Sequence, residues 1–241
     1  MKELRFHLEK MVEFLGLDLN KLQINRLIQY VALLLEGTKK QRLVGEKDGV
    51  ALIEKQLPDA LYPLKLNSIV PGPLQLLDLG TGGGLPGIPL KISLPEIALT
   101  LMDANRRKIN FTRRVAAELG LGGVQFIPGR AEKWGRQPGC RENFDCVVSR
   151  AVAKAAVVVE LGLPLVKKGG TLLLYKGRQG ADEIAEAATP IQLCGGRLER
   201  CWHYRLPTGE KRTLFRIIKE KETPLRYPRR IGKPSQRPLG R

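Results

Sequence analysis

From Leu74 onward, short apolar segments alternate with helical segments, and this alternation restricts the possible fold more than any other feature of the sequence. Helices are expected between the first five apolar segments, for example over Arg106–Leu119 and Lys154–Leu165. This order predicts βαβ units and a parallel sheet that is buried on both faces. The last two segments are joined by residues 206–210, a link too short for a helical crossover, which predicts an antiparallel pair. The predicted strands are Leu74–Leu79, Ile97–Met102, Val124–Ile127, Phe144–Ser149, Thr171–Tyr175, Leu198–Tyr204 and Thr213–Ile218.

The region before Leu74 has the apolar periodicity of helices. Apolar residues recur every three or four positions from Leu4 to Leu15, and Gly16 can end this first helix. Asn20 suits the N-cap of a second helix that ends at Gly37, and a third, weaker helix is expected over Val50–Gln56. Prolines are expected to interrupt the passage into the sheet, at Pro58, Pro63, Pro71 and Pro73. We therefore predict a helical extension over residues 1–70 and a sheet domain over residues 71–221.

The C-terminal segment, residues 222–241, has too few apolar residues to build a core of its own. Four prolines lie among its basic residues, which are Arg226, Arg229, Arg230, Lys233, Arg237 and Arg241. Two interpretations are open: a solvated tail, or an arm that becomes ordered on RNA phosphates. Under the second, truncation after Lys221 should weaken RNA binding and leave cofactor affinity unchanged.

The charge of the chain favours a polyanionic partner. Forty-one Lys and Arg residues face 24 Asp and Glu residues, which gives a formal net charge of +17. Such an excess raises the affinity and association rate for nucleic acid. No apolar run is long enough for a membrane span and no signal-peptide core is present, so we expect a cytoplasmic protein without a membrane partner. The four cysteines and two histidines have no metal-site spacing, so no metal is expected.

A glycine-rich turn follows the first predicted strand, over Asp78–Gly87. Glycines there permit a tight turn and a close approach of the backbone to a ligand. Read from Gly82, the turn matches the GxGxxG pattern of dinucleotide sites, but Asp78 would then face a pyrophosphate. S-adenosylmethionine instead offers an ammonium and a sulfonium group, which a carboxylate attracts. The sequence therefore favours this cofactor, with candidate binding residues Asp78, Gly80, Gly82, Gly84 and Leu85.

Two further segments are expected to complete the nucleoside site. Asp103 ends the second strand, where its two oxygens can accept both ribose hydroxyl protons, although NAD would use the same group. Ala131 and Glu132 follow the third strand, where an adenine ring is expected to lie. For Glu132, a role in starting a helix is an open alternative, because acidic residues favour that end of the helix dipole.

The end of the fourth strand, around Arg150, narrows the chemistry. The Asn/Asp-Pro-Pro-aromatic run of adenine amino methyltransferases is absent there, and none of the four cysteines follows a proline, as the nucleophile of a base-carbon methyltransferase usually does. An acceptor atom with a free lone pair remains, such as nitrogen 7 of guanine, which needs no protein base or nucleophile. Arg150 is expected to hold the methionine carboxylate or an RNA phosphate, with a surface salt bridge as the alternative.

Together these motifs resemble the RsmG (GidB) family. The matching runs are DLGTGGGLPGIPL (78–90), LMDANRRKINF (101–111), GRAE (129–132), VSRAVA (148–153), YKG (175–177) and the ending YPRRIGKPSQRPL (227–239). The resemblance implies a class I S-adenosylmethionine-dependent methyltransferase of Rossmann-like α/β fold that methylates guanine nitrogen 7 in bacterial 16S ribosomal RNA or the small subunit. It places Gly80, Leu85, Ala131, Glu132 and Arg150 at cofactor-binding positions.

The chain departs from the family pattern in two places. Where members usually carry Asn-Leu-Thr, this sequence reads Arg42-Leu43-Val44, and where they carry His-x-x-Asp-Ser it reads Gln56-Leu57-Pro58-Asp59-Ala60. Asp59 is kept, and together with Arg150 and Lys176 it is our candidate for positioning the substrate. The departures leave two alternatives open, a methyltransferase with another acceptor and a non-catalytic RNA-binding protein of the same fold.

Overall fold

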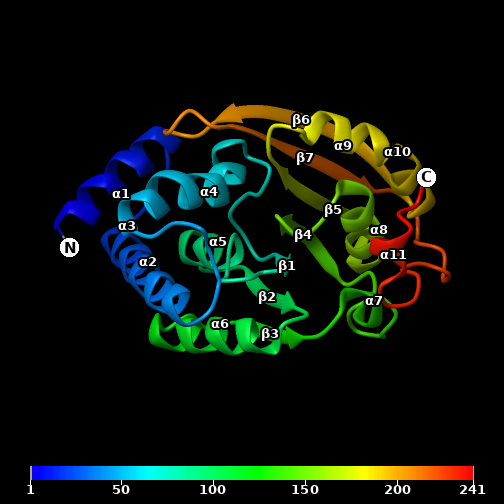
Figure 1. The fold of residues 1–241 in the computed structure, drawn as a ribbon, viewed down its shortest axis with the longest axis horizontal. Coiled ribbons are helices and arrows are strands. Elements are labelled where there is room, and N and C mark those ends of the chain that lie inside the picture. The colour runs from blue at the N-terminus through cyan, green and yellow to red at the C-terminus, as the bar shows by residue number, and fades with distance from the viewer. Residues whose placement is uncertain (1, 241) are drawn as a thin grey trace.

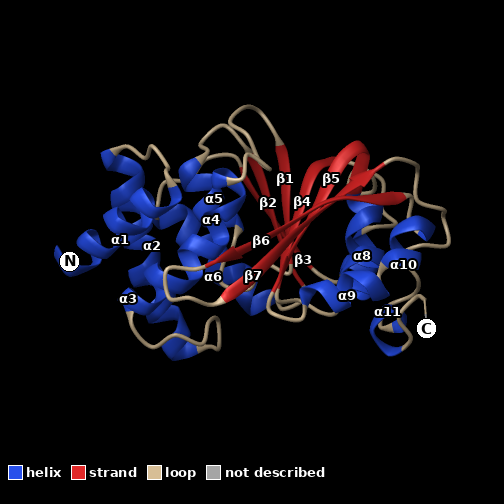
Figure 2. Cartoon of the chain, turned by 90° about the horizontal axis from the view of Figure 1, so that it is seen from above, coloured by secondary structure: helices blue, strands red, loops and turns tan. Residues whose placement is uncertain are grey.

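A computed structural model, described here for residues 2–240, shows a mixed sheet of seven strands between two layers of helices (Figures 1 and 2). The strand order is β3-β2-β1-β4-β5-β7-β6. The first five strands are parallel, and β7 is antiparallel to both β5 and β6, which confirms the predicted topology. The strands are β1 Gln75–Leu79, β2 Ala98–Asp103, β3 Val124–Pro128, β4 Phe144–Arg150, β5 Val166–Lys176, β6 Gly196–Arg205 and β7 Lys211–Lys219.

Each face of the sheet has its own apolar core. Helices α5 (Gly87–Ser93) and α6 (Arg106–Glu118) share one side with the N-terminal helices, as Figure 2 shows. The other side carries α8 (Ala155–Gly162), the 3₁₀ turn η2 (Leu163–Leu165), α9 (Gly180–Glu186) and α10 (Ala188–Leu193). Burial on both faces explains why the central strands are almost continuously apolar. Because the first five strands are parallel, their carboxyl ends meet at one edge of the sheet, where the candidate site lies.

The second N-terminal helix is longer than predicted. Helix α1 spans Lys2–Leu15, and α2 spans Lys21–Lys40 after a capping box that Asn20 forms with Gln23. The predicted end at Gly37 is wrong, because Gly37 is a packing position inside α2. A Cβ there would lie 2.3 Å from the ring of Phe111 on α6, so the glycine allows the two helices to approach closely.

The predicted break at Pro58 and Pro63 is also wrong. Helix α3 (Gly49–Ala51) passes through the π-helical turn η1 (Leu52–Gln56) into α4 (Leu57–Lys65). Pro58 lies in the first turn of α4, where a missing N–H is tolerated. Pro63 is inside α4, near its end, and the helix stops two residues later. The continuous helix places Gln56 and Asp59 beside the sheet.

The C-terminal segment is folded onto the molecule, so the solvated-tail interpretation is wrong. Its order comes from contacts within the protein, such as those to Glu160 and Glu132, and does not need RNA phosphates. Its described residues, 222–240, include the short helix α11 (Lys233–Gln236), which lies beside α8 and near α7 (Ala131–Trp134) in Figure 1. Tyr227 and Pro234 are buried. Although the segment lacks a core of its own, it shares the core of the domain. Arg241 lies outside the described residues. No helix within residues 2–240 has the length and apolarity to cross a membrane.

Candidate functional site

The turn after β1 is held open by two glycines in the left-handed region. Gly80 has φ +78° and Gly82 has φ +56°, conformations that side chains with a Cβ rarely adopt. The Gly80 amide donates to the carbonyl of Met102 at 2.8 Å, which fixes the turn to β2. A Cβ on Gly82 would have no described atom within 4 Å, so this backbone faces open space. The turn therefore exposes its backbone to a ligand-sized volume.

Asp78 lies behind this turn and holds its shape. Its Oδ2 accepts the Thr81 hydroxyl at 2.7 Å and the Gly87 amide at 2.9 Å. The side chain is fully buried, and burial raises its pKa to about 6 in spite of these two hydrogen bonds. Oδ1 has no hydrogen-bond partner among the described residues. Neither Asp78 nor Gly84 lines the cavities described below, so their contribution to binding is indirect.

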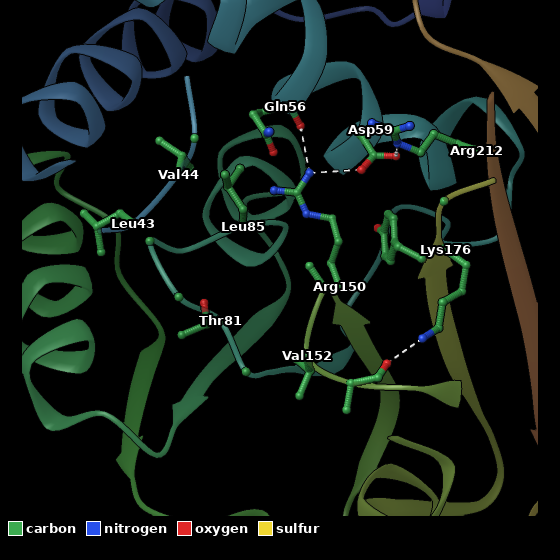
Figure 3. A pocket seen from close by; sticks show the side chains of 18 of the residues that line it. Leu43, Val44, Gln56, Asp59, Thr81, Leu85, Arg150, Val152, Lys176 and Arg212 are labelled. Carbon is green, nitrogen blue, oxygen red and sulfur yellow. Dashed lines mark hydrogen bonds and ion pairs between the residues drawn. The ribbon is translucent and has the colours of Figure 1, made fainter. Parts of the chain in front are cut away.

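Two neighbouring cavities open along the carboxyl ends of the strands. The larger one, of about 750 Å³, is drawn in Figure 3. The smaller one has a volume of about 150 Å³. Gly80, Val152 and Ala153 border both cavities. A Cβ on Gly80 would lie 2.3 Å from Val152, so glycine is required where the chain after β4 crosses the turn. The two cavities therefore adjoin at Gly80.

The smaller cavity contains the predicted nucleoside residues. Asp103 accepts the Gly82 amide on one oxygen at 3.0 Å and the Asn105 amide on the other at 2.8 Å. Glu132 is buried, and its Oε1 accepts the Gly232 amide of the C-terminal segment at 3.0 Å. The remaining walls are largely apolar and include Met102, Ala131, Val157 and Leu161. An apolar slot with carboxylates at its margin fits an adenosine group.

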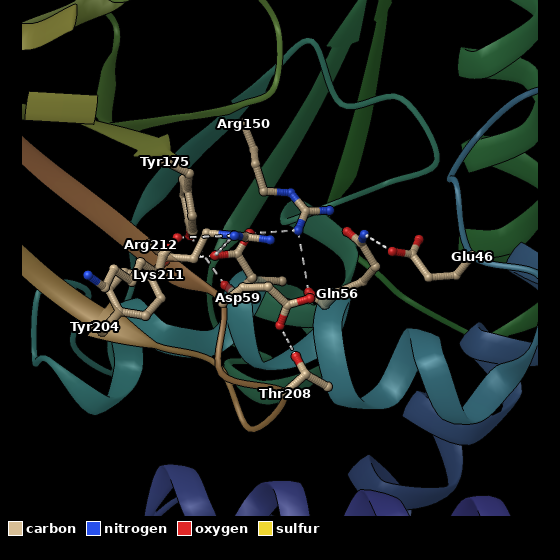
Figure 4. Close-up of polar contacts among 11 residues, drawn as sticks. Glu46, Gln56, Asp59, Arg150, Tyr175, Tyr204, Thr208, Lys211 and Arg212 are labelled. Atoms are coloured by element: carbon tan, nitrogen blue, oxygen red, sulfur yellow. Dashed lines mark hydrogen bonds and ion pairs between the residues drawn. The ribbon is translucent and has the colours of Figure 1, made fainter. Parts of the chain in front are cut away.

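At the far side of the larger cavity, Arg150 and Asp59 form a largely buried ion pair (Figure 4). Arg150 Nη1 lies 3.0 Å from Asp59 Oδ2 and 3.4 Å from the Gln56 carbonyl. Tyr204 donates its hydroxyl to Asp59 Oδ1 at 2.7 Å, and Arg212 lies 3.9 Å from the same oxygen. Burial, followed by the charge of Asp59, raises the pKa of Tyr204 and keeps it a donor. Arg150 therefore does form a salt bridge, as the alternative expected, but a largely buried one and not one on the surface.

Lys176 faces the same cavity from the end of β5. Its ammonium donates to the Ala153 carbonyl at 2.6 Å and pairs with Glu183 at 2.7 Å, which ties the chain after β4 to α9. Two further cations line this cavity, Lys108 from α6 and Arg212 from β7. Cations outnumber carboxylates along the wall, so the cavity favours an anionic ligand.

The structure brings most of the predicted site residues to one edge of the sheet. Gly80, Gly82, Leu85, Asp59, Arg150 and Lys176 line the larger cavity, and Asp103, Ala131 and Glu132 line the smaller one. Sequence reasoning missed Tyr204 and Arg212, which no local motif marks, and it assigned no role to Ser235. The basic Tyr-Pro-Arg ending was the one available pointer to Ser235. No group of three or more His, Cys, Asp or Glu residues within residues 2–240 is arranged to hold a metal ion.

Comparison with known proteins identifies the family. Residues 23–211 match the family model GidB, described as rRNA small subunit methyltransferase G. The chain belongs to this family. It is 43% identical to ribosomal RNA small subunit methyltransferase G of Lachnoclostridium phytofermentans, with 93% of each chain covered. It is 39% identical to the Alkaliphilus oremlandii protein of the same name, over 98% of this chain and 99% of the relative.

Solved structures support the fold of this GidB-family chain. A Methanococcus maripaludis protein described as a candidate S-adenosyl-L-methionine-dependent methyltransferase aligns with a TM-score of 0.55 at 13% identity, covering 80% of this chain and 93% of that one. TrmN from Thermus thermophilus aligns with a TM-score of 0.52 at 19% identity, and the alignment covers 69% of this chain and 53% of TrmN. The predicted class I methyltransferase fold is confirmed.

Proposed function

We propose that this chain transfers a methyl group from S-adenosylmethionine to nitrogen 7 of a guanine in bacterial 16S ribosomal RNA. The observation that carries the proposal is the pair of adjoining cavities at Gly80 in a chain of the GidB family. The relatives are named ribosomal RNA small subunit methyltransferase G, and the site has the shape and groups that such a reaction needs.

The residues present fit the cofactor. The open space before Gly82 accepts a ligand that a Cβ would displace, and Asp103 keeps lone pairs free for ribose hydroxyls. The apolar walls around Ala131 suit an adenine ring, while the cations of the larger cavity suit the methionine carboxylate. When bound, this cofactor supplies an electrophilic methyl group on a sulfonium.

The protein's part in this reaction is alignment. Nitrogen 7 of guanine carries no proton and has a free lone pair, so no protein base or nucleophile is required. Asp59 and the Gln56 carbonyl hold the guanidinium of Arg150 in one orientation at the wall of the larger cavity. Because the guanidinium is already fixed, it loses little further conformational entropy when it binds a phosphate or carboxylate. This favours productive alignment of the bound group.

The RNA partner is supported by charge. The net charge of +17 and the cations Lys108, Lys176 and Arg212 at the larger cavity attract a phosphate backbone. An rRNA or small-subunit substrate implies that the protein acts in the cytoplasm.

Incubation of the purified protein with labelled S-adenosylmethionine and undermodified small ribosomal subunits tests the proposal. Nucleoside mass spectrometry should find 7-methylguanosine, and cleavage with borohydride and aniline should give one new primer-extension stop in 16S RNA. The Arg150→Ala variant should lose this product. RNA binding and cofactor binding without methyl transfer would instead indicate the non-catalytic alternative.

A different methyl acceptor is the second candidate, because the family departures lie at the cavity itself. Leu43, Val44 and Gln56 line the larger cavity, and Gln56 lies beside the Arg150–Asp59 pair (Figure 3). Val44 is apolar where relatives usually carry threonine, and Gln56 stands in place of their histidine, whereas Leu43 matches the family pattern. Transfer to another base or to a small molecule, with no 7-methylguanosine in the RNA, would select this candidate.

A further inference from the structure

The C-terminal segment reaches the smaller cavity. Ser235, in α11, is one of the residues that line it, together with Asp103, Ala131 and Glu132. Three positions earlier, the Gly232 amide donates to Glu132 Oε1 at 3.0 Å. The C-terminal segment, more than 90 residues from Glu132 in sequence, therefore supplies part of the wall of this cavity. It also supplies the hydrogen bond that orients the buried carboxylate of Glu132.

A buried ion pair anchors this arrangement. Glu160 on α8 is completely buried, and Arg229 is its partner through both guanidinium and backbone. Arg229 Nη2 lies 2.6 Å from Glu160 Oε2, while its Nε and its amide lie 2.8 and 2.9 Å from Oε1. Such a bidentate, charge-assisted contact fixes position as well as orientation. The segment is therefore held at a point three residues before Gly232.

The approach to this anchor is fixed as well. Arg141 donates to the carbonyls of Tyr227 at 2.9 Å and Gly135 at 2.8 Å. Pro228 packs against Gly135, where a Cβ would lie 3.0 Å from the proline ring. Gly135 directly follows α7, the helix that carries Ala131 and Glu132. The segment and the α7 wall of the smaller cavity are thus held together as one unit.

We propose that residues 229–236 are part of the cofactor site, with Ser235 closing the adenosine cavity and Gly232 positioning Glu132. The proposal rests on the proposed function, because it assigns the smaller cavity to the adenosyl group. It reverses the expectation drawn from the sequence alone, since perturbing the C-terminal segment now weakens cofactor binding. Gly232 and Arg229 are positioning residues, which act through Glu132 and through the anchor.

A pair of substitutions in α11 tests the proposal in the full-length chain. Ser235→Trp places a large side chain at the cavity wall, and Gln236→Trp places the same side chain next to it, outside the cavity lining. Both residues are exposed, so both variants should keep the melting temperature of the wild-type protein. Calorimetry with S-adenosylhomocysteine should show an affinity at least about tenfold lower for Ser235→Trp, and an unchanged affinity for Gln236→Trp.

Hydrogen exchange of the wild-type protein provides a second test that needs no substitution. Binding of S-adenosylhomocysteine should slow exchange in peptides that cover residues 229–236, and leave α1 unchanged. Equal affinity in both variants, or ligand protection that leaves residues 229–236 unaffected, would overturn the proposal. If the wild-type protein itself does not bind S-adenosylhomocysteine, the proposed function fails together with this proposal. If the wild type binds the ligand and both variants bind it equally well, only the role of the C-terminal segment fails.

Discussion

The substitution Asp78→Asn should remove a pH dependence that one buried carboxyl group gives to the stability of the fold. Burial raises the pKa of Asp78 from 3.8 to about 6. Because the folded pKa lies above the unfolded value, the folded state binds this proton more tightly than the unfolded chain does. The group therefore stabilises the fold fully below about pH 4, and this contribution is lost as the pH rises through about 6.

The expected magnitude follows from the difference between the two pKa values. A difference of about two units corresponds to roughly 3 kcal/mol of unfolding free energy. The amide of an asparagine can accept the same two hydrogen bonds, from Thr81 and Gly87, and it leaves its NH₂ group where Asp78 Oδ1 has no described partner. The variant should therefore fold, with its stability independent of this titration.

Urea denaturation at about pH 4.5 and about pH 7.5 measures the effect. For each protein, the change in unfolding free energy between the two pH values is determined, and the change in Asp78→Asn is subtracted from that in the wild type. Asp182→Asn, at an exposed position of α9, is the control with the same change in formal charge. Because a pH of about 4.5 lies above the unfolded pKa of 3.8, part of the full effect is already lost there. We therefore expect the difference between wild type and Asp78→Asn to be about 2 kcal/mol, and the control to follow the wild type. The same pH dependence in wild type and Asp78→Asn would refute the reasoning.

Three further substitutions probe the cavities. Gly82→Val should cost about 1–2 kcal/mol of stability through its positive φ and abolish binding of S-adenosylhomocysteine in calorimetry; normal affinity would contradict the site. Asp103→Ala removes the acceptor of the Gly82 amide, and its affinity for the same ligand should fall at least about tenfold, whereas an unchanged value would exclude a ribose contact. Arg150→Ala leaves the carboxylate of Asp59 with only its more distant partner Arg212, at 3.9 Å, and should lower the unfolding free energy by up to about 3 kcal/mol in urea titrations. A loss below about 0.5 kcal/mol would mean that the pair is effectively solvated.

The sequence predicted the elements whose pattern is local. The seven strands and their directions follow from apolar segments and link lengths, and the observed strands differ mainly at their ends. Strand β5, for example, begins at Val166, where Lys167, Lys168 and Gly169 interrupt the apolar pattern. The helices between β5 and β6, α9 and α10, were not predicted. Helix α10 contains Pro190, a residue that usually argues against a helix.

The parts that the sequence did not predict depend on contacts between distant residues. Arg150 meets Asp59 across 91 positions, and Tyr204 meets Asp59 across 145 positions. The C-terminal segment is ordered because Glu160 and the α7 wall provide the partners that its own composition lacks. The spacing of residues along the chain does not reveal such contacts. The Arg150–Asp59 pair and the wall that Ser235 adds to the smaller cavity are therefore seen only in the structure.

Binding of the cofactor by the purified wild-type protein tests the central claim most directly. Calorimetry should show saturable, one-to-one binding of S-adenosylhomocysteine and no binding of NAD under the same conditions. Uptake of NAD in place of the sulfur nucleoside, or no uptake of either, would contradict the assignment of the two cavities and with it the methyl-transfer function.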